Sequence, residues 1–402
     1  MKVPDKITLV LLVVLLYSGS VTIYLFWPPP SSAEYALVID AGSSGPRIHL
    51  YKWQQDDDAS IPLIEEIPLE KDCKKTEPGL SKREPGDIDK SLEPLIRCAR
   101  SKLNDQVEDL KAIPLYLMAT AGMRLLENKN ERRHDKIMEQ VRAYLEGAPF
   151  DFRDASTIDA REEALYAWVA ANYLNGSLAT KTENGMIGIL ELGGASGQIA
   201  FVPQDLKPEN TEVVHIAGIK YKVYAWGYDG VGKTKITKAF ENEKLCFPTN
   251  YKMAGGRVGE GDHDECQGRI IEYLATTDQP AFRQLRDDTR PEPNGRFLAI
   301  SNFVFTPNVF GQENVMDYNE LGISGSKYCS TEWEKIGEEY PNALEDYRSE
   351  YCLMAAYIPA LLTHGFRVKE RDEDNKHRVT LRLDGSKADV DWTLGALILL
   401  LH

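Results

Sequence analysis

The chain has 402 residues, 62 of them acidic and 47 basic, so its formal net charge at pH 7 is −15. This balance excludes a nucleic-acid backbone as the main partner, because binding many phosphates over a large footprint requires a basic surface. With 43% hydrophobic and 27% charged residues, the composition is that of a globular protein of roughly two or three domains.

The N-terminal region is more apolar than the rest of the chain. Residues 7–27 carry no charge, two lysines precede them and three prolines follow them. About 20 apolar residues span a bilayer, whereas the apolar part of a cleaved signal peptide has about 7–15 residues. We therefore predict a transmembrane signal anchor at 7–27 and a cytoplasmic stub at 1–6. The rest of the chain would then be extracellular, at the plasma membrane, or in the lumen of the secretory pathway. A cleaved signal peptide is the alternative.

A strand–turn–strand unit follows this region and is repeated later in the chain. Residues 35–51 read YALVIDAGSSGPRIHLY and residues 186–202 read MIGILELGGASGQIAFV, with Asp40 aligned to Glu191. Each unit predicts an apolar strand, an acid at its end, a turn of small residues and a second strand. The backbone amides of such turns bind anions, and carboxylates bind hard cations. Two facing loops of this kind would grip a polyphosphate; the alternative is two ordinary glycine-rich hairpins.

Two further segments lie between these units. An apolar run at 113–118 predicts a strand that leads into a turn of small residues and then into a helix near 130–145. Residues 159–174 predict another helix, whose first turn contains the adjacent Glu162 and Glu163. Carboxylates at a helix start are favoured by the helix dipole, so this pair alone does not indicate a function.

Residues 227–234, GYDGVGKT, match the Walker A pattern. A P-loop NTPase acting through this segment is one alternative function. We favour a surface turn, because no partner strand ending in an acid is evident and because cytosolic ATP chemistry conflicts with the predicted compartment. The surface-turn interpretation predicts that Lys233→Ala leaves turnover nearly intact.

The cysteines indicate an oxidising compartment. An even number of cysteines predicts disulfides there, although the residues alone leave the pairing open. Asn175 begins an Asn-Gly-Ser sequon, which predicts N-glycosylation. The six cysteines are Cys73, Cys98, Cys246, Cys266, Cys329 and Cys352.

Five short motifs in a fixed order carry a resemblance to a known family. They read DAGSSGPR (40–47), ATAGMRLL (119–126), REEALYAW (161–168), ELGGASGQ (191–198) and DWTLGAL (391–397). In their order and spacing they resemble the ecto-nucleoside triphosphate diphosphohydrolases, the apyrase family, and its cell-surface branch in particular. The resemblance implies an α/β fold of two ribonuclease H-like lobes of the actin/Hsp70/sugar-kinase superfamily, with an interlobe active-site cleft. It also implies cysteines paired in sequence order, lobe I at 28–160 plus 388–402, and lobe II at 161–387.

The resemblance implies metal-dependent hydrolysis of nucleoside tri- and diphosphates such as ATP, ADP, UTP and UDP by direct attack of an activated water. Glu163 matches the general base of the family, and Ser196 and Gln198 match the residues that hold the water. Asp40 and Glu191 match the acids that hold Ca²⁺ or Mg²⁺ through coordinated waters.

Two larger groups of residues would complete the implied site. The phosphate-binding group comprises Ser43, Ser44, Gly45, Thr120, Gly193, Gly194 and Ala195. The candidates for nucleobase binding are Phe303, Phe305, Tyr347 and Arg348.

Four positions depart from the family's pattern. Glu191 stands where the family has Asp, and Ala164 stands where a Gly is usual. Pro46 removes a backbone donor from the first loop, and Val304 replaces a stacking aromatic. These departures motivate a second alternative, a catalytically degenerate apyrase-fold ectodomain that binds nucleotides without hydrolysing them.

Overall fold

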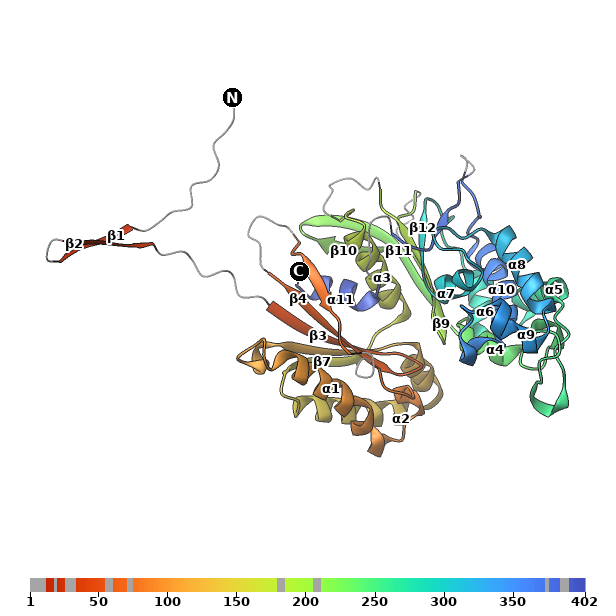
Figure 1. Ribbon diagram of the computed structural model, residues 1–402, viewed down its shortest axis with the longest axis horizontal. Helices are drawn as coiled ribbons and strands as arrows, with labels where there is room; N and C mark the ends of the chain where they lie inside the picture. The colour runs from red at the N-terminus through yellow and green to blue at the C-terminus, as the bar shows by residue number, and fades with distance from the viewer. Residues whose placement is uncertain are drawn as a thin grey trace, which may run out of the picture.

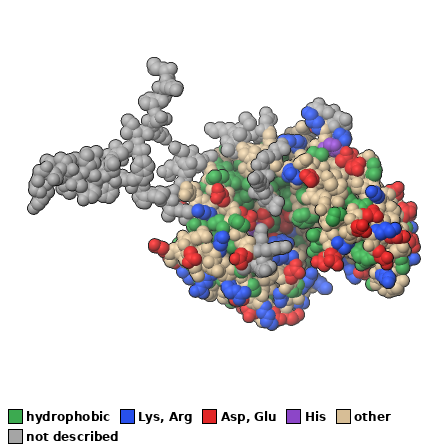
Figure 2. All heavy atoms as spheres, in the orientation of Figure 1, with side chains coloured by type: hydrophobic (Ala, Val, Ile, Leu, Met, Phe, Trp, Pro, Cys, Tyr) green, Lys and Arg blue, Asp and Glu red, His purple; other side chains and the backbone are tan. Residues whose placement is uncertain are grey.

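The computed structural model describes residues 34–54, 61–70, 75–178, 185–204, 211–372, 376–383 and 390–401, together with the backbone of two strands near the N-terminus. The chain from residue 34 onward forms two lobes, each built on one β-sheet (Figure 1). Charged side chains are scattered over the visible face of both lobes (Figure 2), while buried apolar residues form the cores.

Lobe I is built on a five-stranded mixed sheet. Its strands, in the spatial order β5-β4-β3-β6-β7, are β3 (Glu34–Ala41), β4 (Pro46–Trp53), β5 (Ile64–Ile67), β6 (Pro114–Ala119) and β7 (Asp151–Thr157). β3, β6 and β7 are parallel, so their carboxyl ends meet at one edge of the sheet. Because side chains alternate along a strand, Leu37 and Ile39 pack against α1 (Asp89–Leu103) and α2 (Ala121–Glu146), whereas Val38 faces lobe II.

Lobe II is built on a six-stranded sheet. In the spatial order β10-β11-β9-β8-β12-β13, its strands are β8 (Gly188–Leu192), β9 (Ser196–Phe201), β10 (Glu212–Ile216), β11 (Ile219–Asp229), β12 (Phe297–Ser301) and β13 (Val379–Thr380). Leu190 and Ile199 pack against outer helices, whereas Ile189 and Ala200 face α3 (Ala160–Leu174).

The outer helices of lobe II are short and follow one another closely in the chain (Figure 1). They are α4 (Lys233–Ala239), α5 (His263–Thr276), α6 (Pro280–Asp287), α7 (Asn302–Val309), α8 (Tyr318–Ser330), α9 (Trp333–Glu339) and α10 (Tyr351–Ala360), which the π-helical turn η9 (Leu361–Phe366) continues. Short 3-10 turns lie at η2 (Leu80–Lys82), η3 (Pro85–Asp87), η4 (Leu110–Ala112), η6 (Lys244–Cys246), η7 (Ala254–Gly256) and η8 (Glu345–Tyr347).

Two helices lie between the sheets. α3 packs on β9 and β11, and α11 (Trp392–Leu401) packs on α3 and β3 (Figure 1). Their close approach requires Gly395, because a Cβ at that position would lie 1.8 Å from the carbonyl oxygen of Tyr166. The glycine of the fifth motif therefore allows the lobes to share one apolar layer.

Both predicted strand–turn–strand units are present. In the first, β3 pairs antiparallel with β4 and Asp40 lies opposite Arg47. In the second, β8 pairs antiparallel with β9 and Glu191 lies opposite Gln198. Each predicted acid thus lies at the end of a strand, directly before the turn.

The N-terminal segment differs from the predicted transmembrane helix. Within 7–27 the structure describes only β1 (Leu12–Tyr17) and β2 (Ser20–Leu25), which pair antiparallel, and the rest of the segment lies outside the described residues. Among the helices that the structure describes, none is long and apolar enough to cross a membrane. An uninterrupted apolar run has no period that separates helix from strand, and its Val, Ile, Thr and Tyr residues favour strands.

Two of the three expected disulfides fall within the described residues. Cys246–Cys266 joins η6 to α5, and Cys329–Cys352 joins α8 to α10. Cys98 is disulfide-bonded as well, but its expected partner Cys73 lies outside the described residues. N-glycosylation of Asn175 stays a prediction.

Peptide mapping without reducing agent is expected to find all three sequential pairs, including Cys73–Cys98. Each bond closes a short loop and contributes about 3 kcal/mol in the chain-entropy model. Cys246 and Cys266 are fully buried, so the mapping should be done on denatured, alkylated protein. Free thiols at these two positions would contradict both the pairing and the oxidising compartment.

Candidate active site

A cavity of about 370 Å³ lies between the two lobes and is lined by residues from both. The predicted site residues that line it are Asp40, Ser43, Ser44, Thr120, Glu163, Glu191, Gly193, Gly194, Ala195, Ser196, Phe305 and Tyr347. These residues come from segments up to about 300 positions apart in the chain, so the fold brings the predicted motifs together at one place.

The two glycine-rich loops face each other across this cavity. A Cβ on Gly194 would lie 3.0 Å from Ser43 Oγ, so the second loop contacts the first almost directly. Gly45 is an exception among the predicted loop residues: it does not line the cavity, and a Cβ there would lie 1.8 Å from the carbonyl oxygen of Thr76. Gly45 is therefore needed for the chain to pass this neighbouring segment, not for direct contact with a ligand.

Asp40 is the next-to-last residue of β3; it is buried and lines the cavity from lobe I. Its Oδ2 accepts a hydrogen bond from Arg47 Nη1 at 3.2 Å, while its Oδ1 is buried without a hydrogen-bond partner. Burial raises the pKa of Asp40 to about 7, although the Arg47 charge acts in the opposite direction. The carboxylate is thus incompletely neutralised by the protein.

Glu191 is the counterpart of Asp40 in lobe II. Ser301 Oγ donates a hydrogen bond to its Oε1 at 3.2 Å, and its Oε2 is buried without a hydrogen-bond partner. Burial, together with the nearby Glu163 charge, raises the pKa of Glu191 to about 8. Two buried carboxylates, each with one oxygen that lacks a hydrogen-bond partner, are suited to bind a divalent cation. Such a cation would neutralise their charge and take oxygen ligands.

The two adjacent glutamates at the start of α3 make different contacts. Asp159 caps the helix, and Glu162 Oε2 accepts a hydrogen bond from the Asp159 backbone N–H at 2.8 Å, which completes a capping box. Glu163, one residue later, is turned about 100° around the helix and lines the cavity. Its Oε2 accepts from Arg124 Nη2 at 2.9 Å, and burial raises its pKa despite this arginine.

Ser196, the first residue of β9, lines the same cavity as Glu163. Gln198 Nε2 donates a hydrogen bond to Ser196 Oγ at 2.8 Å. Gln198 itself is fully buried and does not line the cavity. The glutamine therefore fixes the direction of the serine hydroxyl from behind.

The four nucleobase candidates separate into two groups. Phe305 and Tyr347 line the cavity and are 59% and 43% exposed. Phe303 is fully buried in the core of lobe II, where its ring packs against Phe366, so it cannot stack on a base. Arg348 lies outside the cavity lining and donates from Nε to the carbonyl oxygen of Ala343. The prediction that Phe303 and Arg348 contact the nucleobase is therefore wrong.

The Walker-like segment is not a P-loop. Residues 227–229 end β11, which pairs antiparallel with both neighbouring strands, and the following helix α4 has only seven residues. A P-loop instead follows a strand and opens a long helix of an α/β unit. Lys233 nevertheless lines the cavity, where its Nζ lies 2.6 Å from Glu350 Oε2 and 3.7 Å from the centre of the Tyr347 ring.

Lys233→Ala is expected to raise KM several-fold and leave kcat within about threefold. The lysine side chain contacts Tyr347, a nucleobase candidate, and none of the residues expected to activate water. We therefore expect it to stabilise the bound ground state and the transition state equally. Steady-state kinetics with ATP and ADP measure this split. A loss of kcat of about a hundredfold, or 2.7 kcal/mol, would show that Lys233 acts on the transferring phosphoryl group.

Sequence reasoning missed several residues of the site. Arg47 could have been found from the hairpin register, which places it opposite Asp40. The other missed residues are Lys75, Arg124, Asp229, Thr234, Ser301, Asn302 and Glu350. Arg124 lies within the second motif, and Asp229 and Thr234 lie within the Walker-like segment, but only the tertiary fold shows that they reach the site.

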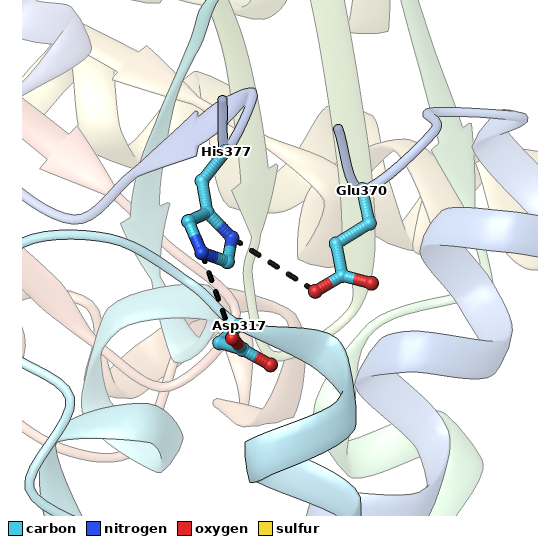
Figure 3. A group of neighbouring side chains, drawn as sticks. All are labelled: Asp317, Glu370 and His377. Carbon is cyan, nitrogen blue, oxygen red and sulfur yellow. Dashed lines mark ion pairs between the residues drawn. The ribbon is translucent and has the colours of Figure 1, made fainter. Parts of the chain in front are cut away.

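A second cluster of charged side chains lies in lobe II, outside the cavity lining (Figure 3). Asp317, Glu370 and His377 bring one ligand atom each within 4.8 Å of one another, and of the residues that the structure describes only they form such a group. Arg371 Nη2 donates to His377 Nε2 at 2.9 Å and lies 3.5 Å from Asp317 Oδ2. The guanidinium already supplies the cluster's cation, which indicates a structural ion-pair network.

The sequence matches the GDA1/CD39 (nucleoside phosphatase) family over residues 28–402. It is 31% identical to "Probable apyrase 5" of Arabidopsis thaliana, over 92% of this chain and 82% of the relative. It is 27% identical to "Ectonucleoside triphosphate diphosphohydrolase 1" of Mus musculus, over 92% and 81% of the two chains.

A solved structure has the same overall fold. The structure of a nucleoside triphosphate hydrolase from Neospora caninum superposes with a TM-score of 0.64, covering 92% of this chain and 93% of the other at 15% identity. At that identity the likeness concerns the fold alone, which is a mixed α/β fold of two lobes. Since the family match extends over nearly the whole chain, the protein belongs to the GDA1/CD39 (nucleoside phosphatase) family.

Proposed function

We propose that the protein is a nucleoside triphosphate diphosphohydrolase, which hydrolyses nucleoside tri- and diphosphates to lower phosphates and inorganic phosphate. Family membership and the apyrase relatives support nucleoside phosphate hydrolysis. The observation that carries the proposal is the interlobe cavity, where two facing loops of small residues meet a buried glutamate and a fixed serine hydroxyl.

The chain's own residues would position the phosphate and the water. The backbone amides of Gly194 and Ala195 and the hydroxyls of Ser43, Ser44 and Thr120 would bind the terminal phosphate from both lobes, whereas the Gly193 N–H already donates to the Ser196 carbonyl oxygen at 2.9 Å. Ser196, oriented by Gln198, would hold a water in line with the bond to be broken. Glu163 would accept a proton from that water as its oxygen attacks phosphorus and the nucleotide oxygen leaves with its electron pair.

Asp40 and Glu191 would hold a divalent cation, Ca²⁺ or Mg²⁺. The support is the pair of buried carboxylate oxygens that have no hydrogen-bond partner, Asp40 Oδ1 and Glu191 Oε2. A bound cation would neutralise charge on the phosphate oxygens. The longer side chain of Glu191, compared with the family's Asp, is accommodated by its hydrogen bond from Ser301.

The nucleobase would lie further from the loops, against Tyr347 and Phe305. Both rings are partly exposed within the cavity lining, and aromatic faces stack on bases of every kind. This arrangement predicts weak discrimination between ATP and UTP.

We further propose an extracellular or lumenal location, with membrane attachment through residues 7–27. The disulfides support an oxidising compartment, and the uncharged run supports the attachment. A glycan on Asn175 that a glycosidase removes would support this location. A catalytic domain that protease cleaves from the cytosolic side of the membrane would contradict it.

A phosphate-release assay with ATP, ADP, UTP and UDP, each with Ca²⁺ or Mg²⁺, tests the proposed activity. The proposal predicts release from all four nucleotides. Nucleotide binding without phosphate release would instead support the degenerate, non-hydrolytic alternative that the departures at Glu191 and Pro46 motivated.

A further inference from the structure

Asp229 and Arg124 lie directly behind Glu163, outside the cavity lining. Asp229 is the last residue of β11 and lies opposite Ser196 in the sheet register. Arg124 Nε donates to Asp229 Oδ2 at 2.8 Å, and Arg124 Nη2 donates to Asp229 Oδ1 at 2.7 Å. The carboxylate therefore holds one edge of the guanidinium at two points, the strongest geometry available to this pair.

The remaining contacts leave Arg124 almost no freedom. Its Nη1 donates to the carbonyl oxygen of Ile158 at 3.0 Å, and its Nη2 also donates to Glu163 Oε2 at 2.9 Å. The Arg124 and Glu163 side chains are only 9% and 8% exposed, and that of Asp229 is 20% exposed. Solvent therefore screens these charges weakly.

The guanidinium joins three parts of the fold. Arg124 belongs to α2 of lobe I, Asp229 to β11 of lobe II, and Ile158 and Glu163 to the crossover where the chain passes from β7 into α3. A change in the direction of Arg124 would move the hydrogen bond that fixes one oxygen of Glu163. A displacement of about 1 Å between reacting groups can cost about a hundredfold in rate.

We propose that Asp229 is a positioning residue for hydrolysis, which aims Arg124 so that its guanidinium holds the Glu163 carboxylate through Oε2 in the orientation that the attacking water needs. The inference rests on the proposed role of Glu163 as the general base. Asp229 does not line the cavity, so we expect it to contribute to kcat and not to KM.

Asp229→Asn is the first test, because the amide keeps the shape but replaces one acceptor by a donor that faces Arg124. The expected result is a fall of about tenfold or more in kcat, with KM for ATP changed less than about twofold. The same substitution on a Glu163→Gln background is expected to change kcat less than about twofold, since a residue that acts through Glu163 has no effect once the base is gone.

Asp288→Asn is the matched control. Asp288 is another largely buried carboxylate near β11 that accepts hydrogen bonds from the Tyr224 and Tyr228 hydroxyls, and it does not line the cavity. It should lower thermal stability and keep kcat. If Asp229→Asn does not fold, Arg124→Lys serves instead, because lysine keeps the charge but cannot bind both carboxylates as a planar fork.

The outcomes separate the two proposals. An equal loss from Asp229→Asn in both backgrounds, or a loss confined to KM, overturns the positioning role and leaves Glu163 as the base. An unchanged rate in Glu163→Gln overturns the base assignment itself. For Arg124→Lys, an equal loss of kcat with Glu163 present and on the Glu163→Gln background would overturn the positioning role.

Discussion

Glu163→Gln is expected to lower turnover by about 10² to 10⁴-fold while changing nucleotide affinity little. The substitution keeps the size of the side chain and its hydrogen-bonding reach, but the amide cannot accept the proton of the attacking water. In the proposed site, ground-state binding would come from the loops and the aromatic rings, which the change does not touch. Steady-state phosphate release gives kcat, and calorimetry with a non-hydrolysable nucleotide gives the affinity.

Glu162→Gln is the control for this experiment. The structure places the Glu162 carboxylate on the backbone N–H of Asp159, at the exposed start of α3. An amide oxygen can still accept that hydrogen bond, so the variant should keep most of the rate. If Glu162→Gln were slow and Glu163→Gln were fast, the general base would be Glu162 and not Glu163. Full activity in both variants would show that the base is another residue.

Removal of divalent cations is expected to abolish hydrolysis, and Ca²⁺ or Mg²⁺ should restore it. The reason is the pair of buried, partly unpartnered carboxylates Asp40 and Glu191, which would otherwise repel both each other and the phosphate. Phosphate release in excess EDTA, followed by addition of either ion, measures the effect. Undiminished activity in excess chelator would contradict the proposed role of the two acids.

The same carboxylates predict a pH dependence that does not rely on activity. Burial raises the pKa of Asp40 to about 7 and of Glu191 to about 8, above the value of about 4 for unfolded chains. Their protonated forms therefore stabilise the cation-free protein below about pH 4, and this contribution is lost as the pH rises through about 7 to 8. Thermal unfolding should show a larger stabilisation by Ca²⁺ at about pH 8 than at about pH 5; an equal stabilisation at both would place the ion elsewhere.

The two hairpins could be predicted from local sequence, because the residues that determine each strand and turn are adjacent in the chain. An apolar run, an acid and a turn of small residues suffice to place Asp40 and Glu191 at strand ends, and the tertiary fold then brings the loops together. The separation of Glu162 from Glu163 likewise follows from the 100° rotation per helical residue, with the capping box fixing the register.

Long-range contacts and side-chain direction set the limit of the sequence argument. Phe303 and Phe305 are two residues apart on α7, so they point to nearly opposite sides, and only packing decides which one faces the cavity. Arg124 and Asp229 meet across 105 positions of chain, and neither shows a local signal of partnership. The surface-turn interpretation of the Walker match missed that Lys233 lines the cavity, since the pattern records neither the direction of its strand nor which side of the fold the turn faces.

Product analysis in ¹⁸O-labelled water tests the central claim most directly, because it reports which phosphorus the water attacks. The purified protein would be incubated with ATP and a divalent cation, and the nucleotide and phosphate products would be examined by mass spectrometry. Attack on the terminal phosphorus predicts ADP or AMP without label and inorganic phosphate that carries it. Pyrophosphate, or label in the nucleotide, would contradict the account. ATP that stays intact although it saturates the unmodified enzyme would contradict it as well.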